Sequence, residues 1–391
     1  MNPFLFGFSP YLPSSELKCS KLAYNQVGDN TGNLAFCYAI DQILGGGLKS
    51  ALWHAEPKTL KMLGDVGVLT LANQLGEHAN LGYLNDNFNK LDISLVGIGL
   101  GAQAGNLQSS VDIPKGTLDW IRIVQEKSPT NSPNIGVRGA FTLNALEKYG
   151  LADKAVSLGC PTLFINPDKQ LGKTIFDKFS PKFDLIAVTA GHQRWTHLAR
   201  LEASLVSLAQ SCGGSYICQS PLEMVQIGRG EAKLLDNTSL KSCKQYIAPS
   251  MSDEDFIDWS VRYAYSFFSA SAWMEYLRRF DFVIGTRIHG VMLALQVGVP
   301  ALCITHDSRT EELCQTMKVP YVNAKDVMGG IKRDDIQRFF NFDPDEFDKN
   351  RQNLAKNYVQ FLETNGLQPA NYLKLLGGMK LSDLPESPLV L

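Results

Sequence analysis

Short apolar runs alternate with longer amphipathic segments along most of this 391-residue chain. Residues 92–97 (DISLVG) and 183–189 (FDLIAVT) have the length and composition of buried strands. The second run is followed by 195–212, a segment with helical periodicity. This alternation is typical of strand–helix–strand units, in which parallel strands form a sheet and helices cover its faces. The pattern predicts the α/β fold class.

The alternation occurs in two sets, separated by a polar stretch at 166–182 that predicts a linker. At about 150 residues per domain, a chain of this length favours two domains. We therefore expect two Rossmann-like domains facing each other across a cleft, at residues 1–175 and 176–391, with the last helix packing back on the first domain. Strands are predicted at 92–97, 134–138, 155–158, 183–189, 215–218, 281–285, 301–305 and 321–322, and helices at 117–127, 141–149, 195–212, 253–280, 288–297 and 309–317.

Charge and cysteine content exclude several classes of protein. The chain has 37 Lys and Arg against 39 Asp and Glu, a net charge of −2. A dedicated nucleic-acid binder carries a basic excess, so we expect no nucleic-acid partner. The eight cysteines include no CxxC pair, which favours structural thiols in a reducing compartment and no metal site. Because the chain has no signal-like start and no run of 18 apolar residues, we expect a cytoplasmic protein.

The segment 281–309 carries the most informative polar cluster. Arg287 and His289 come directly after one predicted strand, and Asp307 and Arg309 come directly after the next. Carboxyl ends of parallel strands meet at one edge of a sheet, so these side chains should lie close together. A guanidinium fork suits a carboxylate or phosphate, and an imidazole titrates near neutrality. The sequence predicts an anion site with an acid–base group in it.

Two weaker signals lie in the N-terminal half. Residues 97–104 contain a GxGxxA pattern after a predicted strand, but no helix pattern follows it. We interpret this run as a loop with close backbone approach, and we expect no dinucleotide or other cofactor. Residues 24–33 form a turn with two glycines before a helical stretch, where free N–H groups can hold an anion or a hydroxyl-rich ligand. The alternative interpretation is a capped turn without a ligand.

These motifs resemble those of the polysaccharide pyruvyl transferases. The C-terminal signature of that family is S-R-x-H, then A-x-x-x-G-x-P, then D-x-K. This chain has, in the same order, Thr286-Arg287-x-His289, then Ala294 with Gly298-x-Pro300, then Asp307-x-Arg309. Three weaker resemblances precede it: Asn25-x-x-Gly28-Asp29 to an N-x-G-D loop, Gly97-x-Gly99 to a glycine-rich strand end, and Val137-Arg138 to a V-R-D motif.

The chain departs from the family pattern at three positions. Arg309 stands where Lys is usual, which keeps the charge and changes the geometry. His306 occupies a position where Tyr is common, and Gly139 replaces the acid of V-R-D. These departures leave the expected donor site intact and affect the expected acceptor side.

The resemblance implies a fold similar to that of the glycosyltransferase-B enzymes. It implies that phosphoenolpyruvate is the donor, bound mainly by residues 176–391, and that residues 1–175 face the acceptor. Pyruvate would be transferred as a ketal onto two hydroxyls of a sugar in a surface polysaccharide, without a metal or cofactor. The acceptor would be a glycan or a lipid-linked saccharide, and a lipid-linked acceptor would bring the protein to the inner membrane face as a peripheral protein.

The chemistry of this reaction assigns roles to particular residues. Phosphoenolpyruvate carries a carboxylate and a phosphate, so several fixed cations must hold it. A proton must also reach C3 of its enol, which requires an acid–base residue. We predict His289 and Arg287 as the catalytic residues. The predicted substrate-binding residues are Asn25, Gly28, Asp29, Arg138, His192, Arg194, Arg287, Ile288, His289 and Arg309.

Two other functions are open. A nucleotide-sugar glycosyltransferase of similar fold would contact the nucleoside through an acidic residue at a helix start, for which Glu311 and Glu312 are the candidates. A non-catalytic glycan-binding protein would have no use for both Arg287 and His289.

Overall fold

Two parallel sheets of six strands each dominate the computed structural model, which describes residues 1–384. The first sheet has the order β2-β1-β3-β4-β5-β6, and every pair in it is parallel. Its strands are β1 (Pro3–Phe6), β2 (Ser50–Ala51), β3 (Val66–Thr70), β4 (Ser94–Leu100), β5 (Ile135–Val137) and β6 (Ala155–Ser157).

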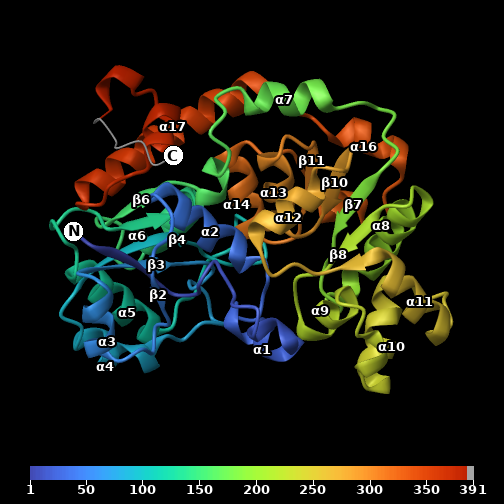
Figure 1. The fold of residues 1–391 in the computed structure, drawn as a ribbon, viewed down its shortest axis with the longest axis horizontal. Helices are drawn as coiled ribbons and strands as arrows, with labels where there is room; N and C mark the ends of the chain where they lie inside the picture. Colours follow the sequence, from blue (N-terminus) through green and yellow to red (C-terminus); the bar gives the residue numbers. More distant parts are fainter. Residues whose placement is uncertain (385–391) are drawn as a thin grey trace.

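The second sheet has the order β12-β11-β10-β7-β8-β9 and is also parallel throughout. Its strands are β7 (Ile186–Thr189), β8 (Ser215–Ile217), β9 (Ala264–Tyr265), β10 (Phe282–Gly285), β11 (Ala301–Thr305) and β12 (Tyr321–Asn323). Figure 1 shows the two sheets in separate halves of the molecule, with helices around each. The predicted class, two Rossmann-like α/β domains, is confirmed.

Helices connect the strands in both domains. In the N-terminal half they are α1 (Ser20–Gln26), α2 (Asn33–Ile43), α3 (Pro57–Leu63), α4 (Asn85–Asn89), α5 (Lys115–Glu126), α6 (Ala140–Glu147) and α7 (Leu171–Lys178). The others are α8 (Ala199–Ser211), α9 (Leu222–Gly228), α10 (Asn237–Ile247), α11 (Asp253–Tyr263), α12 (Ala270–Leu277), α13 (Ile288–Gln296), α14 (Ser308–Met317), α15 (Ala324–Val327), α16 (Arg333–Phe339), α17 (Pro344–Thr364) and α18 (Asn371–Leu376).

The helix predicted at 253–280 is wrong as one element. The chain forms α11, turns into the edge strand β9, and then forms α12, whose first turn is capped by Ser269. The aromatic residues that suggested a continuous helix do form core contacts, as in the stacked pair Phe256 and Trp259. Aromatic spacing alone did not reveal the two-residue strand between the helices.

The two domains share apolar packing. One hydrophobic cluster contains Leu5 and Val96 of the first sheet together with Ile284 and Ile304 of the second. Helix α2 lies between them and contacts α12 and α13. Because buried apolar contact at a domain interface resists separation, this packing fixes how the two sheets face each other.

The stretch predicted as a linker, 166–182, contains the helix α7, which packs against α17. Helix α17 then returns toward the first domain, where Asn365 donates a hydrogen bond to the carbonyl of Pro133 at 2.9 Å. Figure 1 shows α7 and α17 along the same edge of the molecule. A division at residue 175 would fall inside α7, and this boundary stays a prediction.

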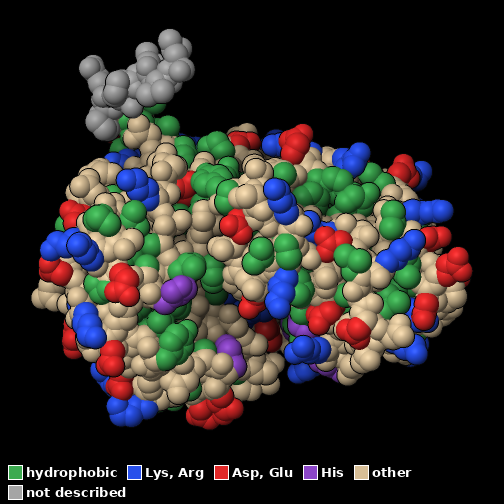
Figure 2. Space-filling model, turned by 60° about the horizontal axis from the view of Figure 1, so that its bottom comes forward, with side chains coloured by type: hydrophobic (Ala, Val, Ile, Leu, Met, Phe, Trp, Pro, Cys, Tyr) green, Lys and Arg blue, Asp and Glu red, His purple; other side chains and the backbone are tan. Residues whose placement is uncertain are grey.

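Acidic and basic side chains are interspersed over the face shown in Figure 2, with a recess between its two halves. This distribution agrees with the nearly balanced charge of the chain. Of the helices in residues 1–384, none has the length and apolar character that a membrane-crossing helix requires.

Candidate active site

The turn between β10 and α13 places Arg287 and His289 at the carboxyl edge of the second sheet. Strand β10 is buried along its whole length because the sheet is covered on both faces. It ends at Gly285, whose φ is 154° and whose missing Cβ would lie 2.2 Å from the carbonyl oxygen of Thr189. Only glycine permits this close approach to β7. Arg287 occupies the N-cap position of α13 without capping it through its side chain, and His289 is the second residue of the helix.

Arg287 is held in place by contacts within its own domain. Its guanidinium lies 4.6 Å from the ring centroid of Trp195 and donates a hydrogen bond to the carbonyl of Ser220 at 3.2 Å. The side chain is buried, and its Nε has no hydrogen-bond partner among the described residues. Burial, with the nearby charge of Arg309, lowers the pKa of Arg287 to about 10. Arg287 therefore keeps a donor free for a ligand.

The next turn, between β11 and α14, carries Asp307 and Arg309. The Asp307 carboxylate caps α14 by accepting a hydrogen bond from the amide of Thr310 at 2.8 Å. It also accepts one from Nη2 of Arg309 at 3.3 Å. Burial alone would raise the pKa of Asp307, but Arg309, His306 and the Thr310 hydrogen bonds lower it to about 2. Asp307 thus stays ionised, and its partner Arg309 retains an Nε without a partner in the described part of the chain.

Arg138 reaches this edge from the other domain. It follows β5, is 1% exposed, and donates from Nε to the carbonyl of Gly99 at 2.9 Å. Its Nη1 is buried and has no hydrogen-bond partner within residues 1–384. Burial lowers its pKa to about 10, and the charge of Arg309 acts in the same direction. Arg138 and Arg309 are thus close enough to repel each other across the domain boundary.

His289 lies among these three guanidinium groups. Burial lowers its pKa well below the usual value, and the charges of Arg138, Arg309 and Arg287 lower it further. Its ring is 5.4 Å from that of Phe36 on α2, and its Nε2 is 4.0 Å from Sγ of Cys160. A neutral imidazole therefore stands near two buried guanidinium groups, Arg138 and Arg287, and the partly buried Arg309. Each of the three has an N–H without a hydrogen-bond partner within residues 1–384. Such a group of fixed cations is suited to a small ligand with several negative charges.

The structure brings Arg138, Arg287, His289 and Arg309 close together. Their roles in binding and catalysis stay predictions. Ile288, between two of them in the chain, is buried and lies in the hydrophobic cluster shared by the domains.

The other predicted residues lie farther out. Asn25 and Asp29 are exposed, at the end of α1 and in the turn after it, where Gly28 and Asp29 both have positive φ. This turn approaches the second domain, because Tyr24 and Ser220 share a hydrogen bond of 3.1 Å between their hydroxyls.

Two residues of the β7–α8 connection complete the prediction. His192 is half-buried, and burial, with the charges of Arg287 and Arg194, lowers its pKa to about 4. Arg194 is exposed, and its amide donates to Nδ1 of His192 at 3.2 Å.

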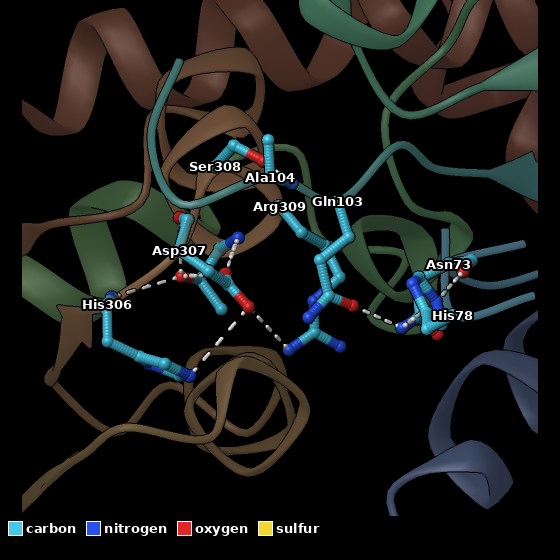
Figure 3. Close-up of polar contacts among 9 residues, drawn as sticks. Asn73, His78, Gln103, Ala104, His306, Asp307, Ser308 and Arg309 are labelled. Atoms are coloured by element: carbon cyan, nitrogen blue, oxygen red, sulfur yellow. Dashed lines mark hydrogen bonds and ion pairs between the residues drawn. The ribbon is translucent and has the colours of Figure 1, made fainter. Parts of the chain in front are cut away.

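An open cavity of about 650 Å³ lies between the domains next to Asp307. Its wall includes Glu77, His78, Gln103 and Asp112 of the N-terminal domain, and no Lys or Arg is among its lining residues. Gln103 accepts a hydrogen bond from Asn73 at 2.5 Å. Figure 3 shows Gln103 and Arg309, which come from opposite domains, with side chains directed into the same region. A volume of this size suits a small-molecule or sugar ligand.

Sequence reasoning missed Trp195, which we had placed at the start of a helix. The helix α8 begins four residues later, and the Trp195 ring packs between the Arg287 guanidinium and the His306 ring, whose centroid is 4.2 Å away. Its position directly after the polar residues that follow β7 was the available signal. Glu312 was considered only as a nucleoside contact, but its carboxylate is buried and accepts two hydrogen bonds from Thr142. Within residues 1–384 no group of His, Cys, Asp and Glu is arranged to hold a metal ion.

Comparison with known proteins gives one family. A family model described as polysaccharide pyruvyl transferase matches residues 121–308, just under half of the chain. The matched segment includes Arg138, Arg287 and His289 and ends one residue before Arg309. The match confirms the resemblance that the motifs predicted, and it supports a pyruvyl transferase acting in polysaccharide synthesis as the general activity.

Two further comparisons add little. A search of curated proteins finds no match. Among solved structures, UDP-N-acetylglucosamine 2-epimerase from Rickettsia bellii aligns over 93% of this chain and 95% of that one, with 14% sequence identity and a TM-score of 0.42. A likeness at that level supports no conclusion about function.

Proposed function

We propose that this chain, whose residues 121–308 match the polysaccharide pyruvyl transferase family, uses phosphoenolpyruvate as donor and forms a pyruvate ketal on two hydroxyls of a sugar. The observation that carries this proposal is the group of three guanidinium groups near His289, two buried (Arg138 and Arg287) and one partly buried (Arg309), each with an N–H that has no partner among the described residues. A carboxylate and a phosphate on one small molecule supply the acceptors and the negative charge that this group lacks.

The reaction balances without a further reactant. C3 of the enol takes up a proton, C2 becomes electrophilic, and one sugar hydroxyl attacks it. Phosphate leaves from C2, and the second hydroxyl closes the ketal. Of the two protons released by the hydroxyls, one replaces the proton given to C3 and the other leaves with phosphate. His289 is the group we assign to the proton transfer at C3, because it is the imidazole beside the cations.

The bound donor would change the protonation of His289. In the free protein, three positive charges disfavour the imidazolium form. Phosphoenolpyruvate brings two to three negative charges, which raise the pKa of the imidazole again. Binding of the donor would thereby favour protonation of His289, the residue assigned as the catalytic acid.

We place the sugar acceptor in the cavity of about 650 Å³ beside Asp307. The carboxylates that line this cavity can accept hydrogen bonds from sugar hydroxyls, and the Gln103 amide can accept or donate them. No Lys or Arg is among the lining residues, so the cavity is a poor site for the anionic donor. Gln103→Ala should therefore raise the acceptor KM and leave phosphoenolpyruvate affinity unchanged. Transfer to a lipid-linked saccharide at the inner membrane face belongs to the same proposal.

Calorimetry with two ligands and one variant tests the donor. Phosphoenolpyruvate should bind, UDP-N-acetylglucosamine should not, and Arg287→Ala should abolish or strongly weaken the first. Binding of the nucleotide sugar in place of phosphoenolpyruvate would overturn the proposal and favour a glycosyltransferase. The contacts of Glu312 argue against a glycosyltransferase, because its carboxylate already accepts two hydrogen bonds from Thr142 and so is not free to contact a nucleoside.

A further inference from the structure

Helix α6 begins without a side-chain cap of its own. The residue at its N-cap is Gly139, whose backbone is extended, with φ of 178°. The first amides of a helix have no partner within the helix, and a Ser, Thr, Asp or Asn at the N-cap usually accepts from one of them. Gly139 cannot do this.

Glu312, from the other domain, takes that place. Its Oε1 accepts a hydrogen bond from the amide of Thr142 at 2.7 Å, and its Oε2 accepts one from the Thr142 hydroxyl, also at 2.7 Å. A Cβ built on Gly139 would lie 2.7 Å from Cγ and 2.8 Å from Oε1 of Glu312. The Glu312 carboxylate therefore fills the space that a side chain at position 139 would need.

This contact joins two elements of the cation cluster. Arg138 immediately precedes the start of α6, and Arg309 lies one turn before Glu312 on α14. The same helix makes a second contact with the first domain, where Ser308 exchanges two hydrogen bonds with Ala104: amide to carbonyl at 3.1 Å, and Ala104 amide to Ser308 hydroxyl at 2.8 Å. The N-terminal half of α14 is thus tied to the first domain at two points.

We propose that Glu312 is a positioning residue for the donor site: by capping α6 from the opposite domain, it fixes Arg138 relative to Arg309, so that one anion can contact both. The donor part of this inference rests on the proposed function. The cross-domain cap itself does not.

Electrostatics alone predicts the opposite effect of removing Glu312. Its carboxyl lies near Arg138, so loss of a negative charge there would strengthen the binding of an anion. Loss of positioning would weaken it, because the two cations would no longer be held together. The sign of the change therefore separates the two explanations.

The first test compares Glu312→Ala with Gln315→Ala, an exposed position on the same helix. In Glu312→Ala, hydrogen exchange at the amides of the first turn of α6 should become faster, and affinity for phosphoenolpyruvate should fall roughly 3- to 30-fold, the range that corresponds to loss of a helix cap. Gln315→Ala should change neither. Unchanged exchange in α6, or tighter donor binding, would overturn the proposal.

The second test restores the cap within one domain. Gly139→Ser can cap α6 in cis once Glu312→Ala and Thr316→Ala make room, since Thr316 Oγ1 lies 2.5 Å from the Cβ position. Compared with the Glu312→Ala/Thr316→Ala double variant, the triple variant should recover slow exchange in α6 without recovering donor affinity. Full recovery of affinity would show that the cap matters and the link between domains does not.

Both tests remain informative if the donor assignment is wrong. If the wild-type protein binds no phosphoenolpyruvate, the proposed function fails, while hydrogen exchange still reports whether Glu312 caps α6. Inorganic phosphate serves as a second probe of the cation cluster, and its affinity should follow the same order among the variants.

Discussion

His289 has an unusual environment for a histidine, and the consequence is a defined pH dependence. An unperturbed imidazole titrates near pH 6.5, and burial with three nearby guanidinium groups lowers the pKa of His289 well below that value. Since the unfolded chain binds this proton more readily than the folded one, the contribution of His289 to stability is present above about pH 6.5 and is lost as pH falls. The wild-type unfolding midpoint should therefore drop more steeply between pH 7 and 5 than that of His289→Gln.

Donor binding should reverse the effect. If phosphoenolpyruvate raises the pKa of His289, binding near pH 6.5 takes up a proton that His289→Gln does not take up. Calorimetry in two buffers of different ionisation enthalpy measures this difference directly. His289→Gln should also lose about 10²- to 10⁴-fold in turnover, with a smaller loss in donor affinity. Equal proton uptake by both proteins would rule out His289 as the group that the donor protonates.

Substitutions of the arginines should differ in how strongly they weaken the binding of phosphoenolpyruvate. Arg287→Ala removes a buried charge-assisted contact, which costs about 1.5–3 kcal/mol, or some 10- to 100-fold in phosphoenolpyruvate affinity. Arg309→Lys keeps the charge and should cost less than about tenfold. Arg262→Ala, at an exposed position on α11, provides the comparison for a general change in charge. Equal losses in the two variants that remove a charge, with none in Arg309→Lys, would indicate a diffuse field effect without specific contacts.

At this scale the sequence predicted residues whose chemistry is tied to a strand end. Arg287, His289 and Arg309 follow strands that their own apolar runs reveal, so their common edge could be inferred. Trp195 had only its position after the polar residues that follow β7 as a signal, and nothing local shows that its ring contacts Arg287 and His306. Glu312 could not be predicted, because no local pattern records which side chain of one domain fills a gap in the other.

At the scale of single elements, the turn after β10 depends on Gly285. A Cβ at this position would lie 2.2 Å from the Thr189 carbonyl oxygen, and the backbone has positive φ. Gly285→Ala should lower the free energy of unfolding by about 1–3 kcal/mol, as overpacking in a core does, and should also weaken donor binding by moving Arg287. Gly329→Ala, where a Cβ meets nothing within 4 Å, is the matched control. Urea unfolding and calorimetry on both variants give the two readouts.

Most strands were predictable from their apolar runs, but length did not decide which ones. Eight strands were found within a few residues, among them the three-residue β5, β6, β8 and β12, whereas β1, β2, β3 and β9 were missed, although β3 is a buried run of five residues. Helix α7 was taken for a linker because its sequence is polar. Its stability comes from packing on α17, a contact that lies more than 170 residues ahead in the chain and leaves no local signal.

At the scale of the whole molecule, Arg351 of α17 is a buried connection between distant segments. It donates to the carbonyl of Leu163 at 2.8 Å and also to the carbonyls of Asn166 and Asp168. Arg351→Met keeps the volume and leaves these acceptors unpaired, so the free energy of unfolding should fall by about 2–4 kcal/mol. Arg338→Met, at an exposed ion pair with Asp335, should change it by less than about 1 kcal/mol. Equal unfolding midpoints for the two variants would contradict this role of Arg351.

The return of α17 to the first domain means that the backbone passes between the domains twice. One connection would leave the domains free to tilt and twist about any axis. Here two connections lie side by side: α7 with the segment before it, and the 21-residue helix α17. Together they restrict rotation between the domains to one axis, which runs along the paired helices. Opening about this axis would have to break the Glu312–Thr142 and Ser308–Ala104 hydrogen bonds before Arg138 could move away from Arg309, whereas Arg287 and His289 lie on one turn of one domain and would stay together. The threading of the chain thus decides which cations of the site can separate.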